Sequence, residues 1–356
     1  MGDESARTPL RRRMGFSYGR AAQTERQVPI APILPAVCKG LSPWPRLCQS
    51  GAMKNAITIP CALLLGLGLL VPSAPLLAAS NGRLPAWVCG SGTPPLFANG
   101  FENGATTHYQ EPSNGSGGGF PGAQTRSVLV SGQPRNYYLY VPNGYPFAGP
   151  IPLLLALHGA GGAGTAPGAA ESVRDVWINT AQSGKFIVAS PIASGSQGGW
   201  VPYTDYPMFK AVIEDVAAAY NIDRSRIHAW GYSAGGHVLH DLALFDWTPN
   251  PVPDINTFAA YGVSAGVLAS QVCGGSGLPS CASVLPQVPR RIPVSLRVGD
   301  SDDYLSWVQA DRNAFLAAGW VSGNTLDYAV FSGGHIIDTY SLHVVWQFFC
   351  PWQRLP

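Results

Sequence analysis

The sequence predicts an α/β protein whose mostly parallel sheet has eight strands and carries helices on both faces. Eight short segments rich in β-branched, aromatic and leucine residues lie between residues 126 and 331. After the first two, such segments alternate with helical patterns, and parallel neighbours need crossovers of this kind. With 46% hydrophobic and 12% charged residues, the chain of 356 residues can also bury a large core.

The first two expected strands, 126–130 and 137–141, are close enough along the chain to resemble a hairpin. Further strands are expected at 152–157, 186–189, 227–232, 258–263, 294–298 and 326–331. Helices are expected at 169–181, 206–220, 234–245, 304–318 and 340–349. In the second of these helices, Phe209, Val212 and Val216 recur at helical spacing and predict one apolar face.

Residues 53–80 have the features of a secretory signal peptide. Lys54 precedes an apolar run at 56–71, and small residues up to Ser80 offer a cleavage site. A membrane anchor is the alternative, but a spanning helix needs about 20 apolar residues, and Pro60 interrupts this run. Residues 1–52 are expected to be an upstream extension outside the fold. We therefore expect a secreted or periplasmic protein with no stable membrane anchor after cleavage.

The mature chain is expected to begin with a flexible lead-in at 81–124, which is rich in Gly, Ser, Pro and Asn. The folded domain is expected at 125–356. Residues 81–356 hold 13 Lys and Arg against 17 Asp and Glu, because nine basic residues precede Asn81. A net charge of −4 over this part argues against nucleic acid as a partner.

Four cysteines remain after signal cleavage, an even number that predicts two disulfides in an oxidising compartment. They are Cys89, Cys273, Cys281 and Cys350. Four cysteines allow three connectivities; pairing Cys273 with Cys281 is the local choice and would leave Cys89 for Cys350. No metal site is expected, because no CxxC pair or nearby His accompanies these residues.

His237 and His240, followed by Asp241, form a second candidate metal site on the helix at 234–245. Histidines spaced by three on a helix that packs under a site are more often buried and hydrogen-bonded than metal-bound. We therefore expect no metal there.

Gly231-Tyr232-Ser233-Ala234-Gly235 fits the pattern G-x-S-x-G, in which small flanking residues allow a sharp strand-to-helix turn that exposes a serine hydroxyl. The pattern also occurs around Ser264. Ser233 lies between an expected strand and a long helical pattern, as such a turn requires, whereas glycines and Pro279 soon follow Ser264. Ser233 is therefore the expected nucleophile, and Ser264 a strand-end turn that borders the same site.

A serine hydroxyl needs an imidazole to take its proton, and the imidazole needs a carboxylate to hold its tautomer. His335 follows the last expected strand in a Gly-rich turn, and three aspartates, Asp300, Asp302 and Asp303, follow the strand before it. Asp302, three residues past Gly299, is the expected partner of the histidine, with Asp303 as the alternative.

An oxyanion needs two amide donors. We expect them to be the backbone N–H groups of Ala234, next to the serine, and of Ala160, in the Gly-rich turn after the strand at 152–157. A phosphate-binding loop is the competing interpretation of these glycines, but no Lys of the required motif is present. Trp200, Tyr203 and Tyr206 are candidates to line a substrate cleft, with core packing as the alternative.

Together, His158-Gly159, the turn at Ser233, Gly299-x-x-Asp302 and Gly333-Gly334-His335 resemble the α/β-hydrolase superfamily. Within it, the chain is most similar to secreted esterases of the polyhydroxybutyrate depolymerase and feruloyl esterase type, and the segment 216–227 supports this. The resemblance spans 126–349. One departure is the stretch 198–209, where the group's usual acidic pattern has no counterpart.

The resemblance implies an α/β-hydrolase catalytic domain at 125–356. It implies a secreted serine esterase that needs no cofactor and acts through an acyl-enzyme on Ser233. The carboxylic ester that it hydrolyses would be polymeric or small: either a polyester, or an aromatic or short-chain acyl ester. Two alternatives stay open: a serine peptidase of the prolyl-oligopeptidase type, and a catalytically silent binding protein on the same scaffold. The oligomeric state is open as well.

Overall fold

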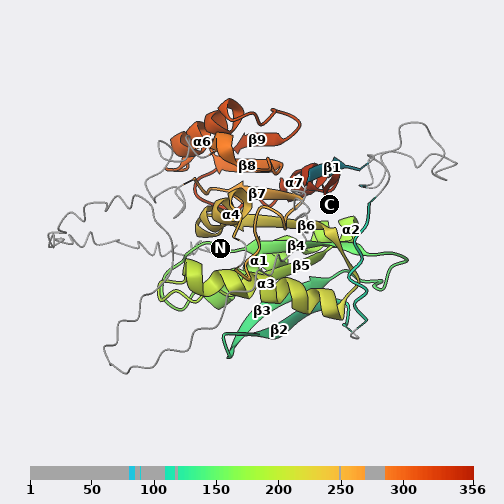
Figure 1. The fold of residues 1–356 in the computed structure, drawn as a ribbon. Helices are drawn as coiled ribbons and strands as arrows, with labels where there is room; N and C mark the ends of the chain where they lie inside the picture. The colour runs from blue at the N-terminus through green and yellow to red at the C-terminus, as the bar shows by residue number, and fades with distance from the viewer. Residues whose placement is uncertain (1–79, 85–88, 90–108, 117–118, 248–249, 269–284) are drawn as a thin grey trace, which may run out of the picture. The chain divides into compact units, whose positions relative to one another are not determined.

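The computed structural model describes residues 80–84, 89, 109–116, 119–247, 250–268 and 285–356 (Figure 1). By its internal contacts the chain divides into two units, 1–71 and 72–356, and every described residue belongs to the second. The expected extension at 1–52, the signal peptide up to residue 79, and Cys273 and Cys281 lie outside the described residues.

A sheet of eight strands forms the centre of this unit, in the order β2-β3-β5-β4-β6-β7-β8-β9. β2 and β3 form an antiparallel hairpin, β3 and β5 are also antiparallel, and all later neighbours are parallel. The strands are β2 (Gly122–Val130), β3 (Gln133–Val141), β4 (Ile151–Leu157), β5 (Ile187–Pro191), β6 (Ile222–Tyr232), β7 (Ala260–Ser264), β8 (Val294–Gly299) and β9 (Leu326–Phe331). The predicted mostly parallel eight-stranded sheet is confirmed.

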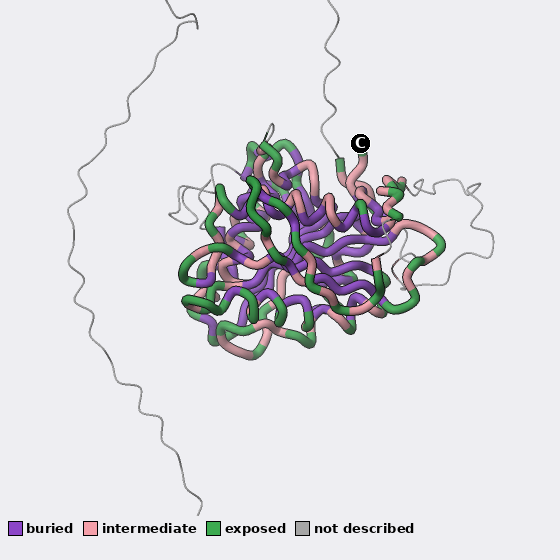
Figure 2. The backbone as a smooth tube through the Cα atoms, turned by 90° about the horizontal axis from the view of Figure 1, so that it is seen from below, coloured by how far each residue is buried: buried purple, intermediate pink, exposed green. Residues whose placement is uncertain are grey.

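Helices cover the sheet on both sides, and each side has its own apolar core. The α-helices are α1 (Ala166–Val176), α2 (Ile178–Gly184), α3 (Pro202–Ala219), α4 (Ala234–Leu244), α6 (Leu305–Ala317) and α7 (Leu342–Phe349); η2 (Leu285–Gln287) is a short 3-10 helix. In β4, Leu153, Leu155 and Leu157 face the core with α3, α4 and α6, whereas Leu154 and Ala156 face the core with α1 and α7. Figure 2 shows buried residues gathered at the centre of the backbone, and β4, β5, β7 and β8 are buried along their whole length.

The helix expected at 169–181 is two helices, α1 and α2, that meet at Trp177. The amide of Trp177 donates to the carbonyl of Arg174, only three residues back, so the first helix closes with a tighter turn. The Trp177 ring is fully buried, 5.6 Å from the ring of Trp230. Helical spacing alone missed this break because apolar residues continue through it.

Described parts of the segment 81–124 pack on the folded unit, although the composition predicted a flexible lead-in. β1 (Ser80–Arg83) pairs antiparallel with β10 (Trp352–Leu355), and Pro112 forms an isolated bridge with Asp223. The expected start of the domain near residue 125 falls inside β2. Neither short strand has an alternating apolar pattern, so composition gave no sign of the pairing.

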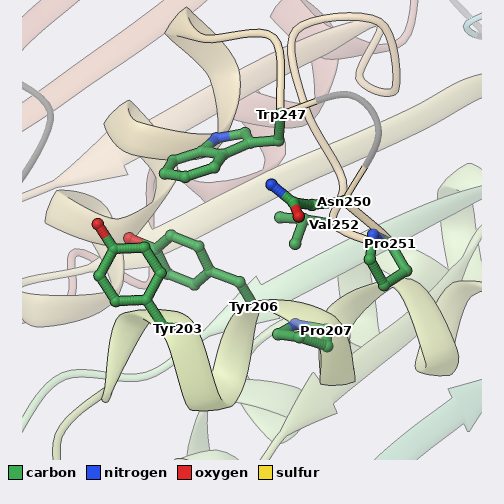
Figure 3. A pocket seen from close by; sticks show the side chains of 7 residues that line it. All are labelled: Tyr203, Tyr206, Pro207, Trp247, Asn250, Pro251 and Val252. Carbon is green, nitrogen blue, oxygen red and sulfur yellow. The ribbon is translucent and has the colours of Figure 1, made fainter. Parts of the chain in front are cut away.

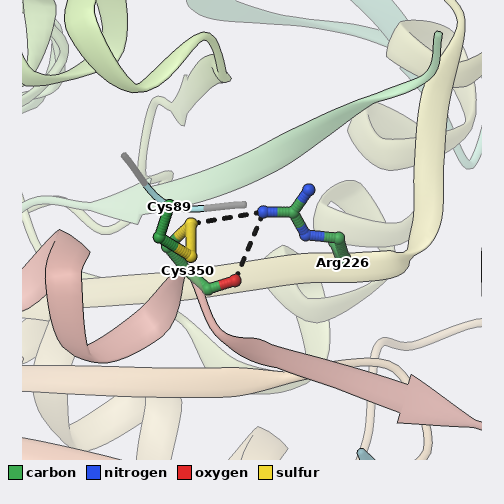
Figure 4. Close-up of a disulfide and its surroundings, with 3 residues drawn as sticks. All are labelled: Cys89, Arg226 and Cys350. Atoms are coloured by element: carbon green, nitrogen blue, oxygen red, sulfur yellow. Dashed lines mark hydrogen bonds between the residues drawn. A yellow bond between two sulfur atoms is a disulfide. The ribbon is translucent and has the colours of Figure 1, made fainter. Parts of the chain in front are cut away.

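Cys89 and Cys350 form a disulfide that joins this segment to the end of α7 (Figure 4). The buried guanidinium of Arg226, on β6, donates to the carbonyl oxygen of Cys350 at 3.2 Å and approaches its sulfur at 3.4 Å. The disulfide thus lies against a central strand of the sheet. In the described part of the chain, no helix combines the length and the apolar character needed to cross a bilayer.

Candidate active site

Ser233 lies in a sharp turn between β6 and α4, with φ 51° and ψ −119°. A positive φ strains a residue that carries a side chain, so the surroundings must hold it in place. A Cβ atom on Gly231 would lie 2.5 Å from the backbone of Gly235, and one on Gly235 would lie 2.4 Å from the carbonyl oxygen of Leu157. Only glycine fits at these two positions, which explains why the pattern G-x-S-x-G occurs here.

The structure brings Ser233, His335 and Asp302 into one chain of contacts. Nε2 of His335 lies 2.9 Å from Oγ of Ser233, and Nδ1 lies 3.0 and 3.1 Å from the two carboxylate oxygens of Asp302. These contacts suit the tautomer in which Nδ1–H donates to Asp302 and Nε2 accepts from the serine hydroxyl. The three residues follow the carboxyl ends of β6, β8 and β9, which share one edge of the sheet.

Of the three neighbouring aspartates, Asp302 is the one that contacts His335. Its side chain is fully buried, and one of its oxygens accepts the amide of Tyr304 at 2.9 Å. Asp303, the alternative, is exposed. Asp300 accepts the amide of Gly333 at 3.0 Å, a hydrogen bond that lowers the pKa of Asp300 and ties the aspartate loop to the histidine loop.

Two tyrosines flank the imidazole of His335. The hydroxyl of Tyr232 donates to the carbonyl oxygen of His335 at 2.6 Å, and the two rings are 5.2 Å apart. The ring of Tyr304 lies 5.2 Å away at nearly a right angle. Burial, with a smaller effect from the charge of Asp302, raises the pKa of Tyr232 to about 12, so this hydroxyl stays protonated and can donate at neutral pH.

The loop after β4 passes close to Ser233: a Cβ on Gly159 would lie 3.1 Å from that of Ser233. Among the described residues, the amide of Ala160, which follows Gly159, has no hydrogen-bond acceptor. Ala234, the other expected donor, is the first residue of α4, where backbone N–H groups have no partner within the helix. Both expected donors therefore belong to segments that flank the serine.

His158 anchors this loop. Its Nε2 accepts the amide of Ala193 at 3.1 Å, so Nδ1 carries the proton and donates to the carbonyl of Gly159 at 2.8 Å. Burial lowers the pKa of His158, which favours this neutral form. Trp200, one of the expected cleft residues, donates from its indole N–H to the carbonyl of His158 at 2.8 Å and so helps to hold the loop in place.

The second serine match and the helical histidines contribute no side chain to these contacts. The carbonyl of Ser264, at the end of β7, accepts the amide of Ser233 at 2.8 Å. Burial lowers the pKa of His237 to about 4 and of His240 to about 3, and Nδ1 of His240 lies 3.2 Å from the hydroxyl of Tyr261. The described residues include no group of three or more His, Cys, Asp and Glu that could hold a metal ion.

The structure does not bring Tyr203 and Tyr206 to the serine. They line a separate pocket of about 130 Å³ beside Trp247 (Figure 3). Tyr206 is 1% exposed and donates to the carboxylate of Asp241 at 2.7 Å. Asp241 is eight residues along α4 from Ser233, about 12 Å at the helical rise. Tyr206 therefore packs in the core, which was the alternative to a place in the substrate cleft.

A larger pocket, of about 240 Å³, lies beside the loop after β4. It is lined by residues 158–161, Ala169, Ser172 and Val173 of α1, Tyr232 and Ile337. No motif in the sequence predicted this pocket. One sequence feature could have indicated the pocket: a helical pattern follows the Gly-rich loop directly, which places the first turns of that helix near the loop.

No family model matches the chain. A curated protein of Nocardia uniformis subsp. tsuyamanensis, named "Putative esterase NocK", is 31% identical over 208 residues, which are 53% of this chain and 53% of that protein. The chain thus spans about half the length of this relative. Among solved structures, a ferulic acid esterase covers 65% of this chain and 99% of its own at 17% identity and a TM-score of 0.48. A protein named FAE covers 64% and 88% at 15% identity and a TM-score of 0.50, a likeness of fold.

Proposed function

We propose that the chain is a serine esterase of the α/β-hydrolase superfamily and that it hydrolyses carboxylic esters through an acyl-enzyme on Ser233. The observation that carries this proposal is the chain of contacts from the hydroxyl of Ser233 through His335 to the buried carboxylate of Asp302. A free serine hydroxyl is a poor nucleophile at neutral pH, and this arrangement is the one that activates it.

In the first step, Nε2 of His335 takes the proton of Ser233 while Oγ attacks the ester carbonyl carbon. Asp302 accepts Nδ1–H, which keeps the lone pair of Nε2 directed at the serine and stabilises the imidazolium that forms. The oxyanion of the tetrahedral intermediate accepts hydrogen bonds from the amides of Ala160 and Ala234. The position of Ala234 at the start of α4 supports this role, since helix N-termini favour negative charge.

In the following steps, His335 donates its proton from Nε2 to the oxygen of the leaving alcohol, and the bond between that oxygen and the acyl carbon breaks. A water molecule then gives a proton to Nε2 and attacks the acyl carbon. When this second tetrahedral intermediate collapses, Ser233 recovers its proton and the carboxylic acid leaves. Every step uses side chains and amides of this chain and needs no cofactor.

We also propose that the protein is exported. A disulfide between Cys89 and Cys350 supports this, because such bonds persist mainly in oxidising compartments. The apolar run at 56–71 is the segment that would direct export. Mass spectrometry of the protein recovered outside the cytoplasm is expected to find an N-terminus near Ser80, and protein that still begins at Met1 would contradict the proposal.

The test of the esterase function is hydrolysis of p-nitrophenyl acetate by the purified chain and by Ser233→Ala. Removal of the nucleophile is expected to lower kcat by at least 10³-fold, and a fluorophosphonate probe should label the native chain but not the variant. Ser264→Ala is the matched control and should keep both activity and labelling. Full activity in Ser233→Ala would overturn the proposal, and a matched amide cleaved as fast as the ester would favour a peptidase.

A further inference from the structure

The pocket of about 240 Å³ adjoins the proposed catalytic groups. Its walls come from the immediate neighbours of the proposed catalytic groups: Tyr232 precedes Ser233, Ile337 is two residues past His335, and Ala160 is a proposed oxyanion donor. A carbonyl carbon bonded to Oγ, with its oxygen at the amides of Ala160 and Ala234, therefore has this pocket beside it.

We propose that this pocket holds an uncharged, apolar group of the ester, up to about the size of a substituted benzene ring, and that Ala169 and Val173 of α1 limit its size. The proposal rests on the proposed esterase function and names the class of substrate group. An apolar cavity of about 150 Å³ is large enough for benzene, so 240 Å³ leaves room for a ring with small substituents or a short chain.

Charge supports this choice of ligand. Among the residues that the structure describes, no Asp, Glu, Lys or Arg lines the pocket. The nearest cation along the chain, Arg174, follows Val173, but its buried guanidinium already contacts Asp175 at 2.6 Å and Glu171 at 3.2 Å and lies over the ring of Tyr138. A carboxylate on the substrate would therefore lose its hydration here, and no Lys or Arg of the described lining would compensate its charge.

The polar atoms of the lining lead to the same conclusion. Both ring nitrogens of His158 are occupied, one by the amide of Ala193 and the other by the carbonyl of Gly159. The hydroxyl of Ser172, an exposed residue, and that of Tyr232 are the remaining side-chain donors, and Tyr232 already donates to the carbonyl of His335. Val173 and Ile337 add apolar side chains to the lining.

The geometry of α1 explains why two of its residues set the size limit. Ala169 and Val173 are four residues apart, so they lie one above the other on a single face of the helix. Val173 is 2% exposed and belongs to the core under α1, whereas Ala169 is half-buried and small. Volume added at residue 169 would thus extend into the pocket with little disturbance of the core.

The test measures kcat/KM for two substrate series. One lengthens the acyl group (p-nitrophenyl acetate, hexanoate and benzoate), and the other lengthens the alcohol (methyl, hexyl and benzyl acetate). In each series, the kcat/KM of each larger substrate is divided by the kcat/KM of the smallest one. In the series whose variable group enters the pocket, Ala169→Trp is expected to lower this ratio at least tenfold. Ala218→Trp, on an exposed position of α3, is the matched control and should leave both ratios within twofold of the native values.

Ser172→Asp provides a second variant at an exposed position, where misfolding is less of a concern. A carboxylate at the pocket wall should lower the same ratio, while Ser127→Asp on exposed β2 should not. Unchanged ratios in both series, for both pocket variants, would overturn the assignment of this pocket. That result is distinct from failure of the esterase proposal, which would appear as activity that survives in Ser233→Ala.

Discussion

At the scale of single residues, the site depends on side chains that the fold holds in costly positions. Ser233 has a positive φ, and the carboxylate of Asp302 is fully buried. A buried carboxylate is tolerated when hydrogen bonds satisfy it, and the amide of Tyr304 and Nδ1 of His335 both lie within reach. The strain and the burial are both compensated by neighbours that the same chain supplies.

The choice among the three aspartates is open to a direct test. Asp302→Asn keeps the shape of the side chain but removes the charge and allows the other imidazole tautomer, so kcat is expected to fall by about 10⁴-fold. Asp303→Asn changes an exposed side chain and should keep kcat within about twofold of the native value. Steady-state kinetics on p-nitrophenyl acetate measure both, and equal losses would reject Asp302 as the residue that orients His335.

At the scale of helices and strands, the differences from the expected elements have local causes. The helix expected at 169–181 divides at Trp177 because the backbone closes a tighter turn there and the indole ring packs against Trp230. β1 and β10 are four residues each, and they pair although almost the whole sequence of the folded unit lies between them. Sequence periodicity reports on side chains, so backbone pairing between such short strands leaves no periodic signal.

α6 carries a carboxylate that is not part of the catalytic contacts. Asp311 is 1% exposed, one of its oxygens accepts the amide of Leu268 at 3.0 Å, and burial raises its pKa to about 7. In the unfolded chain an aspartate titrates near pH 4. The folded state therefore binds the extra proton between about pH 4 and 7, and the resulting stability is lost as the pH rises through that range.

Asp311→Asn is expected to remove this pH dependence, because an amide keeps an acceptor for Leu268 and does not ionise. Urea unfolding of both proteins between pH 4 and 8 measures it. Relative to the variant, the native chain should lose free energy of unfolding as the pH rises from 4 to 7 and then level off. A difference between the two proteins that stays constant over this range would contradict the raised pKa.

At the scale of the whole folded unit, the parallel part of the sheet collects the loops that bear Ser233, Asp302 and His335 at one edge. The Cys89–Cys350 disulfide joins residues 261 positions apart, against β6. A cross-link over so long a loop restricts the unfolded chain strongly, an effect that stabilises the folded state.

Replacement of both cysteines by Ser is therefore expected to lower the free energy of unfolding by about 2–5 kcal/mol. Urea unfolding at pH 7 compares the double variant with the native chain, and alkylation before and after reduction verifies that the bond forms in the native protein. Identical unfolding midpoints would show that the disulfide contributes no stability.

By itself, the sequence determined the number of strands in the main sheet, their approximate bounds and the place of Ser233 between a strand and a helix. These features depend on side-chain periodicity and on glycines at fixed offsets, which are local properties. Only the tertiary structure decided that Asp302 rather than Asp303 meets His335, that Tyr203 and Tyr206 lie away from Ser233, and that α1 lines the pocket beside it. Such contacts join residues far apart along the chain, and their geometry follows from sheet order and helix packing, which no local pattern encodes.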